Sequence, residues 1–214
     1  MDTTTPTAEQ ILDAASAIVI DDSVEALGYG TIARRLGTTP REISLVFPVL
    51  EQLLAGMLNR EVGALSRTIV DNVERDPRGG LPSRIFGYSL CAIYEHPLAR
   101  ALYLADPIGL NRIMRSVDGI VALPEVTIHP ELLPALQDVG MMRRDVEPNA
   151  VAAVINMIGS GVALSAPQQQ LDAATRGLVM MLERAVDADV VDTAPGKLVF
   201  ARCVDSLAVG SPPR

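Results

Sequence analysis

The sequence predicts an all-α protein with a small N-terminal head and a larger helical body. Apolar residues recur at spacings of three and four along most of the chain, and no long alternating run typical of β-strands occurs. The 214 residues, 49% of them hydrophobic, suffice for a buried core. A long amphipathic segment separates a short helical region from the rest. We therefore expect a three-helix head in residues 1–50 and a helical body in residues 51–214.

The first helix is expected to begin at a capping box formed by Thr7 and Gln10. The apolar residues that follow share one helical face: Ile11, Leu12, Ala15, Ile18 and Val19. This stripe predicts a helix that packs one side against the core of the head.

Residues 29–47 predict two short helices joined by a tight turn. Gly37 supplies the left-handed residue that ends the first of them. The second begins with a capping box between Thr39 and Glu42 and has Pro40 at its first position. Two short helices joined in this way are the signature of a helix-turn-helix unit.

The body is expected to start with a long helix from about Leu50 to Asp76, where Pro77 and Gly79-Gly80 interrupt the pattern. Further helical patterns occur at about 81–95, 97–106 and 109–122, before a proline-rich stretch. Apolar stripes then predict helices at about 149–165 and 169–187, and a short helix near Leu198.

The N-terminal region resembles the TetR family of transcriptional regulators over about residues 7–60. The resemblance rests on Ile11-Leu12-Asp13-Ala14-Ala15, Ile32-Ala33, Gly37, Ile43, Phe47 and Glu51-Gln52-Leu53-Leu54. It implies a TetR-like homodimer with two helix-turn-helix heads that bind a palindromic double-stranded DNA operator, and a body that binds a small-molecule effector. We therefore expect a transcriptional regulator of repressor type.

The residues expected to contact DNA lie in the helix-turn-helix unit: Arg34, Arg35, Thr39, Arg41, Ser44 and Leu45. Arg41 is the side chain of the second helix that can pair with a guanine edge. Five positions depart from the family pattern on the DNA-facing surface: Gly28, Ser44, Leu45, Val46 and Leu50. Residues 1–60 also carry four arginines and eight acidic residues, so the head offers few contacts to phosphate.

Four of the seven aromatic residues fall within residues 86–103. In the resembled family this region lines the effector cavity, and an apolar cavity with a few polar groups suits a small hydrophobic or aromatic ligand. The expected ligand-binding residues are Phe86, Tyr88, Cys91, Tyr94, His96, Tyr103 and Asp106. The alternative is that these aromatic residues only fill the core.

The last two long helices are expected to form the dimer interface. Their apolar stripes exceed what the bundle of one protomer needs, and they occupy the dimerisation position of the resembled family. The expected interface residues are Val151, Ile155, Ile158, Val162, Leu178, Met181 and Leu182.

The composition argues against several other classes of protein. A net charge of -8 opposes nonspecific attraction to phosphate backbones or anionic lipid. The two cysteines and two histidines lack the spacing of a metal site, and no cofactor motif occurs, so neither a metal nor a cofactor is expected. The N-terminus lacks the features of a signal peptide, which favours the cytoplasm.

One uncharged segment, from Pro148 to Leu171, has the length of a membrane span. Asn156 and Gly159-Ser160-Gly161 interrupt it, and basic flanks and an aromatic belt are missing. The segment therefore favours a buried helix at a subunit interface, and we expect no membrane association.

No catalytic motif occurs, so an enzyme is the less favoured reading. The alternative to the regulator is a TetR-fold protein that has lost DNA binding and acts as a ligand-binding accessory protein or as a small-molecule enzyme. In that case the acid/base candidates are Tyr88, Tyr94, His96, Tyr103 and Asp106.

Overall fold

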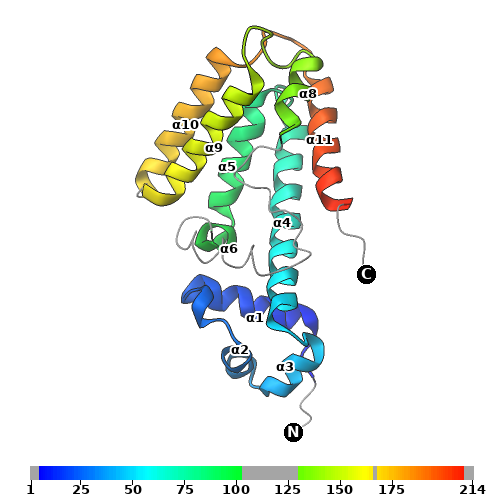
Figure 1. The fold of residues 1–214 in the computed structure, drawn as a ribbon, viewed down its shortest axis with the longest axis vertical. Coiled ribbons are helices and arrows are strands. Elements are labelled where there is room, and N and C mark those ends of the chain that lie inside the picture. The colour runs from blue at the N-terminus through cyan, green and yellow to red at the C-terminus, as the bar shows by residue number, and fades with distance from the viewer. Residues whose placement is uncertain (1–4, 103–129, 166–167, 210–214) are drawn as a thin grey trace. The chain divides into compact units, whose positions relative to one another are not determined.

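The computed structural model describes residues 5–102, 130–165 and 168–209, with side chains except at 159–165, 168–171 and 207–209. The regular elements among these residues are helices, as the sequence predicted (Figure 1). The described chain divides into two compact units within helix α4 (Leu50–Arg75). The first unit holds the residues up to Glu61 and those from His96 to residue 102. The second holds Val62–Glu95 and the residues from 130 onward.

The first unit contains α1 (Ala8–Asp21), the 3-10 turn η1 (Val24–Ala26), α2 (Tyr29–Leu36) and α3 (Pro40–Val46). The capping box at the start of α1 is confirmed, because Thr7 Oγ1 accepts from the Gln10 N–H at 3.2 Å and Gln10 Oε1 accepts from the Thr7 N–H at 2.9 Å. The core of the unit consists of apolar side chains with no exposed surface: Ile11, Ile32, Ile43, Leu53, Met57 and Leu58.

The first unit also includes the short helix α6 (Pro97–Arg100), which packs against α1. The Glu61 carboxylate on α4 accepts a hydrogen bond from the Ala99 N–H at 3.2 Å, and its Oε1 lies 3.4 Å from Nδ1 of His96. This contact joins α4 to the beginning of α6. The helix expected at 109–122 lies outside the described residues.

The second unit is a bundle of α5 (Pro82–Glu95), α8 (Leu132–Asp138), α9 (Pro148–Ser165), α10 (Gln168–Ala185) and α11 (Ala194–Val209). Helix α10 packs along α5, while α8 contacts both α9 and α11 (Figure 1). The helices predicted at 81–95, 149–165 and 169–187 are confirmed. The last helix spans 16 residues and is longer than the short helix expected.

Two glycines bring the turn before α5 against the start of α11. A Cβ atom on Gly80 would lie 2.0 Å from the Thr193 carbonyl oxygen, and one on Gly196 would lie 2.1 Å from the Gly80 oxygen. The Thr193 hydroxyl donates to the Pro77 carbonyl at 2.8 Å, and Lys197 Nζ donates to the Glu74 carbonyl at 2.8 Å. The two segments are therefore held backbone to backbone.

A buried carboxylate joins the end of α10 to the start of α5. Asp187 is 6% exposed, and it accepts from the Ser83 N–H at 3.0 Å and from the Ser83 hydroxyl at 2.5 Å. Ser83 lies in the first turn of α5, where backbone N–H groups have no partner within the helix. Burial raises the pKa of Asp187, although the two hydrogen bonds from Ser83 oppose that rise.

No single helix in the described part of the chain is long and apolar enough to cross a bilayer. Helices α3 and α4 together have the length and apolar composition of a membrane span, but the pair is bent by 65°.

Candidate functional site

The helix-turn-helix unit is built around a left-handed glycine. Gly37 has φ of +66°, and the N–H of Thr38 donates to the Ala33 carbonyl at 2.9 Å, which ends α2. The Tyr29 hydroxyl donates to the Phe47 carbonyl at 2.8 Å and so ties α2 to the end of α3. These contacts hold α2 and α3 in a defined mutual orientation. The predicted helix-turn-helix unit is confirmed.

Glu42 is held in place at the start of α3. Its Oε2 accepts from the Thr39 N–H at 2.9 Å, from the Thr39 hydroxyl at 2.8 Å, and from the Thr38 hydroxyl. The hydrogen bond from the Thr38 hydroxyl is the first cause that lowers the pKa of Glu42, and the bonds from Thr39 add to it. Glu42 therefore remains a carboxylate committed to its own capping box.

The outward face of α3 presents Arg41 and Leu45. Arg41 is exposed, and its guanidinium makes no hydrogen bond or ion pair within the part of the chain that the structure describes. Leu45, one helical turn further on, is 69% exposed. Ser44 lies beside them, and its hydroxyl donates to the Arg41 carbonyl at 2.9 Å.

The other predicted DNA-contacting residues differ in their engagement. Arg34 on α2 is exposed and makes no ion pair with a described residue. Arg35 is exposed as well, but its guanidinium lies 2.7 Å from Asp21 Oδ2 on α1. Thr39 caps α3. The structure therefore leaves two of the three arginines, Arg34 and Arg41, available to a partner.

Val49 extends the outward surface of α3 and was not among the predicted contacts. It is 46% exposed and follows the exposed Pro48, directly after the end of α3. Val49 lies outside α3, so helical periodicity in the sequence does not predict its exposure. The exposed surface near the end of α3 is thus apolar and not cationic.

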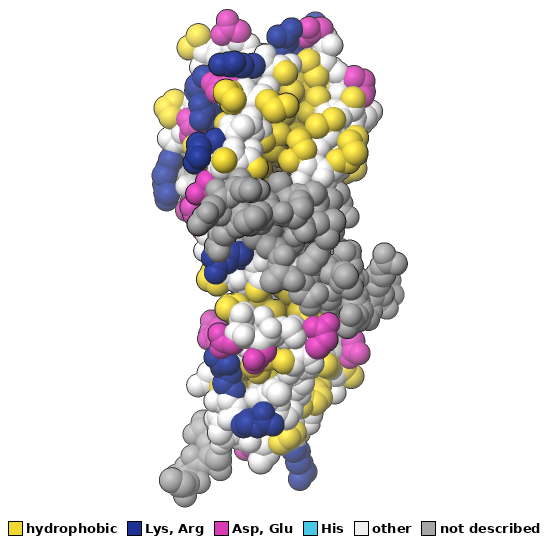
Figure 2. Space-filling view, turned by 90° about the vertical axis from the view of Figure 1, so that its left-hand side faces the viewer, with side chains coloured by type: hydrophobic (Ala, Val, Ile, Leu, Met, Phe, Trp, Pro, Cys, Tyr) yellow, Lys and Arg dark blue, Asp and Glu magenta, His cyan; other side chains and the backbone are white. Residues whose placement is uncertain are grey.

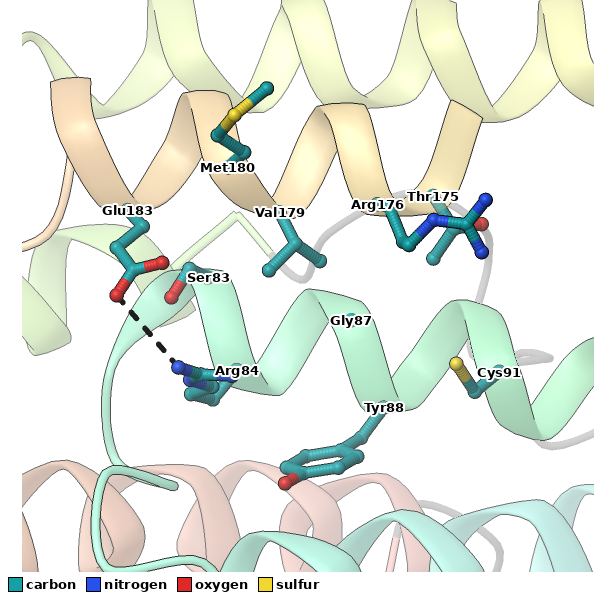
Figure 3. Close-up of a pocket in the computed structure, with 10 residues that line it drawn as sticks. All are labelled: Ser83, Arg84, Gly87, Tyr88, Cys91, Thr175, Arg176, Val179, Met180 and Glu183. Atoms are coloured by element: carbon teal, nitrogen blue, oxygen red, sulfur yellow. Dashed lines mark ion pairs between the residues drawn. The ribbon is translucent and has the colours of Figure 1, made fainter. Parts of the chain in front are cut away.

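A groove of about 340 Å³ lies between α5 and α10 in the second unit (Figure 3). Its lining residues are Ser83, Arg84, Gly87, Tyr88 and Cys91 from α5 and Thr175, Arg176, Val179, Met180 and Glu183 from α10. Val179 points toward Gly87, where an added Cβ would lie 2.9 Å from Val179 Cγ2. The two helices therefore approach closely at the middle of the groove, and charged side chains lie toward its ends.

The predicted ligand-binding residues are distributed over several environments. Tyr88 and Cys91 line the groove, and Phe86 is buried in the core. Tyr94 is half-buried, and a hydrogen bond links it to Thr175, which lines the groove. His96 belongs to the first unit, beside Glu61. Tyr103 and Asp106 lie outside the described residues.

The groove combines an ion-pair network with protonated hydroxyl and thiol groups. The Tyr88 hydroxyl donates to Asp76 Oδ2 at 2.9 Å, and burial followed by this bond raises the pKa of Tyr88. Burial raises the pKa values of Tyr94 and Cys91 as well. These groups therefore keep their protons at neutral pH, which makes them hydrogen-bond donors and not bases or nucleophiles.

Arg84 stands between two carboxylates at one end of the groove. Its guanidinium lies 3.8 Å from Asp76 Oδ2 and 3.8 Å from Glu183 Oε1, and Arg78 approaches the same Glu183 oxygen at 2.9 Å. Among the described residues, no three His, Cys, Asp or Glu side chains gather as metal ligands would. The arrangement is suited to holding a small molecule by apolar contact and hydrogen bonds.

Hydrophobic side chains gather on the face of the second unit formed by α9 and α10 (Figure 2). The most exposed of them are Met157 and Met181, at 66% and 61%, and Val154 lies beside Met157 on α9. A face of this kind marks an interaction surface, because soluble monomers seldom expose several large apolar side chains together.

The predicted interface residues lie on both sides of these two helices. Met181 is on the exposed face, whereas Ile155, Leu178 and Leu182 are buried inside the unit. Val151 and Ile158 are half-buried, and the side chain of Val162 lies outside the described residues. A side chain already buried in one protomer has little surface left to bury against another. The exposed set to consider is therefore Val154, Met157 and Met181.

Over most of the chain, the fold is similar to that of two solved regulators and a solved receptor. The fatty acid degradation regulator FadR from Bacillus halodurans superposes with a TM-score of 0.56 at 14% identity, covering 83% of this chain and 94% of the other. The ketosteroid transcriptional regulator KstR2 of Mycobacterium tuberculosis gives a TM-score of 0.54 at 16% identity, with coverages of 87% and 98%. A γ-butyrolactone receptor (ArpA-like protein) gives 0.54 at 17% identity, with coverages of 92% and 96%.

The fold is TetR-like. The resemblance seen over residues 7–60 of the sequence is thereby confirmed as a likeness of fold, and it extends over most of the chain. No protein-family model matches the sequence, and the search of curated proteins returns no match. This chain therefore shares a TetR-like fold with structures to which it is only 14–17% identical.

Proposed function

We propose that the protein is a dimeric transcriptional regulator of repressor type whose DNA binding is modulated by a small hydrophobic or aromatic ligand. The observation that carries the proposal is the helix-turn-helix unit, in which Ile43 anchors α3 in the core while Arg41 and Leu45 face solvent. Structures with the same fold include a ketosteroid transcriptional regulator and a fatty acid degradation regulator. This similarity of fold supports regulation of transcription as the function of this chain.

Each polar residue of the DNA surface has a distinct role in this proposal. Arg41 donates to the O6 and N7 acceptors of a guanine in the major groove. Arg34 pairs with a backbone phosphate, and Arg35 does so when it leaves Asp21. Thr39 and Ser44 hold α3 in shape through their hydrogen bonds and so position the arginine. The small number of cations makes binding modest and salt-dependent.

A dimer is the form in which two heads read a palindrome. We assign the interface to the exposed face of α9 and α10, where Val154, Met157 and Met181 present apolar surface without charge. A two-fold axis places the same face of each protomer against the other. We place such a protein in the cytoplasm, together with the DNA that it binds.

The ligand acts by shifting a population of conformations. An effector changes DNA binding only if its affinity differs between the DNA-competent and the incompetent state. The groove between α5 and α10 has the volume of a small-molecule site, and Tyr88 and Cys91 bring aromatic and soft apolar surface to it. We assign the ligand to this groove and the adjoining middle helices.

The second candidate function is a ligand-binding protein with a TetR-like fold that does not bind DNA. Two observations favour it. The ion pair between Arg35 and Asp21 withdraws one of three head arginines, and the outward face of α3 presents the apolar Leu45 and Val49. In this reading the groove between α5 and α10 is the functional site, and a catalytic role requires a base that Tyr88 and Tyr94 do not supply, since both pKa values are raised.

The deciding experiment is DNA binding by the full-length, ligand-free protein. Fluorescence anisotropy is measured with DNA from upstream of its own gene, at low and at physiological salt. We expect sequence-specific binding that Arg41→Ala weakens roughly tenfold to a hundredfold through loss of a bidentate guanine contact. Arg144→Ala, which removes an exposed arginine from the second unit, is the matched control and should leave the affinity unchanged.

The outcomes separate the two functions. Absence of specific binding in the ligand-free protein, or binding that ignores sequence and vanishes with salt, contradicts the regulator and favours the ligand-binding protein. Specific nanomolar binding that survives Arg41→Ala would show that α3 is not the surface that reads DNA.

The dimer is tested by sedimentation at micromolar concentration. Met181→Arg should convert the dimer to a monomer, because it introduces an unpaired charge into an apolar contact. Leu198→Arg is the matched control, since Leu198 on α11 is 59% exposed and Met181 is 61% exposed. A wild-type monomer, or a dimer that tolerates Met181→Arg but not Leu198→Arg, would refute the assigned interface.

A further inference from the structure

Leu45 lies on the outward face of the last turn of α3, where its side chain is mostly uncovered by the described residues. It is 69% exposed and lies four residues after Arg41, so the two side chains share one face of the helix. An exposed leucine on a surface whose other outward side chain is a hydrogen-bond donor is best buried against an apolar group of a binding partner. Val49, 46% exposed, extends the same apolar surface beyond the end of α3.

The neighbouring polar side chains of α3 are already committed within the protein. Glu42 Oε2 accepts from Thr39 and from Thr38, which holds this side chain at the start of α3. The Ser44 hydroxyl donates to the Arg41 carbonyl at 2.9 Å. Among the described side chains of α3, the guanidinium of Arg41 and the methyl groups of Leu45 are therefore what reaches outward.

The major groove offers one apolar feature to such a side chain. Guanine, adenine and cytosine present hydrogen-bonding groups there, whereas thymine also presents its C5-methyl group. A leucine placed against a polar base edge would strip water from it without replacing the hydrogen bond, which is unfavourable. The methyl group of thymine is the base-pair feature that Leu45 complements.

We propose that Leu45 reads a thymine methyl group about two base pairs from the guanine read by Arg41, an inference that rests on the proposed DNA-binding function. Four residues of α-helix rise about 6 Å, close to the rise of two base pairs at 3.4 Å each. The half-site therefore contains a guanine and, about two base pairs away, a thymine. A DNA partner fits this face better than an apolar protein partner, because the guanidinium of Arg41 on the same face makes no ion pair with a described residue.

The test uses DNA that differs only by one methyl group. Each thymine of the bound half-site is replaced in turn by deoxyuridine, and the affinity of the full-length protein is measured by fluorescence anisotropy. We expect one position at which the loss of the methyl group weakens binding roughly fourfold in one half-site and about tenfold to twentyfold in both. In DNA that carries cytosine instead of thymine at that position, replacing the cytosine by 5-methylcytosine should restore part of the affinity.

Variants of the exposed Leu45 assign the effect to that side chain. Leu45→Ala should bind the thymine and deoxyuridine sites equally, and Leu45→Gln should shift the preference toward adenine, with which glutamine pairs. Leu198→Ala changes another exposed leucine, 59% exposed and in the second unit, and should retain the full discrimination.

Each other outcome overturns a different statement. Specific DNA binding that is indifferent to every thymine methyl group overturns this inference and leaves the proposed function standing. Discrimination that persists in Leu45→Ala assigns the methyl contact to another residue, such as Val49. Absence of DNA binding overturns both the inference and the proposed function, and it leaves the apolar face of α3 to a protein partner.

Discussion

The helix-turn-helix region and the place where the start of α5 meets the segment between α10 and α11, called here the α5–α11 junction, both hold helix ends together, yet they are closed in different ways. The first is closed by groups that lie close in sequence: Thr39 with Glu42, and the Thr38 N–H with the Ala33 carbonyl. The second is closed by groups about a hundred residues apart, such as Ser83 with Asp187 and Pro77 with Thr193.

This difference separates two kinds of stability. Local capping contributes modestly to the free energy of unfolding, and each contribution depends on one or two side chains. Long-range closure depends on backbone atoms in contact and on a buried carboxylate, so that the loss of one group exposes or strains several others. The helix-turn-helix region should therefore tolerate substitutions that the α5–α11 junction does not.

The largest effect is expected for a methyl group added at the junction. Gly80→Ala places a Cβ atom 2.0 Å from the Thr193 carbonyl oxygen, a backbone atom that cannot move aside. We expect a loss of at least about 3 kcal/mol in the free energy of unfolding, or failure to fold. Urea denaturation followed by circular dichroism, at fixed protein concentration, measures it.

The matched control is a glycine of the head. A Cβ atom on Gly30 in α2 meets nothing within 4 Å, so Gly30→Ala should stabilise the protein by about 0.5–1 kcal/mol. Equal effects of the two substitutions would break the comparison between the regions, and a neutral Gly80→Ala would show that the backbone contact does not form in solution.

A smaller effect is expected at the buried carboxylate. Asp187→Ala leaves the Ser83 N–H and hydroxyl without their acceptor and should cost about 1–3 kcal/mol, whereas Asp187→Asn keeps an acceptor and should cost less. The pKa of Asp187 is raised in the folded state, so its stabilising contribution is full below the ordinary aspartate value of 3.8 and declines as the pH rises through the raised value.

The stability difference between the wild type and Asp187→Asn should accordingly shrink as the pH rises from below 3.8 toward neutrality. Denaturation at a series of pH values measures this difference. A difference that grows with pH would mean that the carboxylate is stabilised as an anion, and that the hydrogen bonds from Ser83 outweigh burial.

The smallest effect is expected at the cap of α3. Thr39→Ala should lower the free energy of unfolding by about 1 kcal/mol, because one N–H group of the first turn loses its acceptor. The exposed Thr5 lies before α1, and Thr5→Ala is the control. A cost as large as that of Gly80→Ala would contradict the distinction drawn between local and long-range closure.

The same capping box should also depend on pH. Because the threonine hydroxyls lower the pKa of Glu42, the contribution of this capping box to stability should be lost as the pH falls through that lowered value.

The amino-acid sequence by itself determined the helix-turn-helix unit and most of the helices, but not α8 or the length of α11. The capping boxes at Thr7 and Thr39 and the left-handed Gly37 act over three or four residues, so their pattern in the sequence is enough to place helix ends. The bounds of α4, which begins at Leu50 and ends before Pro77, follow from the same local rules.

The faces and partners of the helices in the second unit were decided by the tertiary structure. Apolar residues occur on both sides of α9, so periodicity alone does not tell that Ile155 packs inward while Met157 faces outward. The groove needed α10, since Val179 and Arg176 come from almost a hundred residues beyond Tyr88. In the sequence, Gly80 indicates only the end of a helix. The close approach of the Thr193 carbonyl in the folded protein is what leaves no room for a side chain at this position. Helix ends depend on neighbours along the chain, whereas burial and cavities depend on which distant segment arrives, and that is decided by packing of the whole unit.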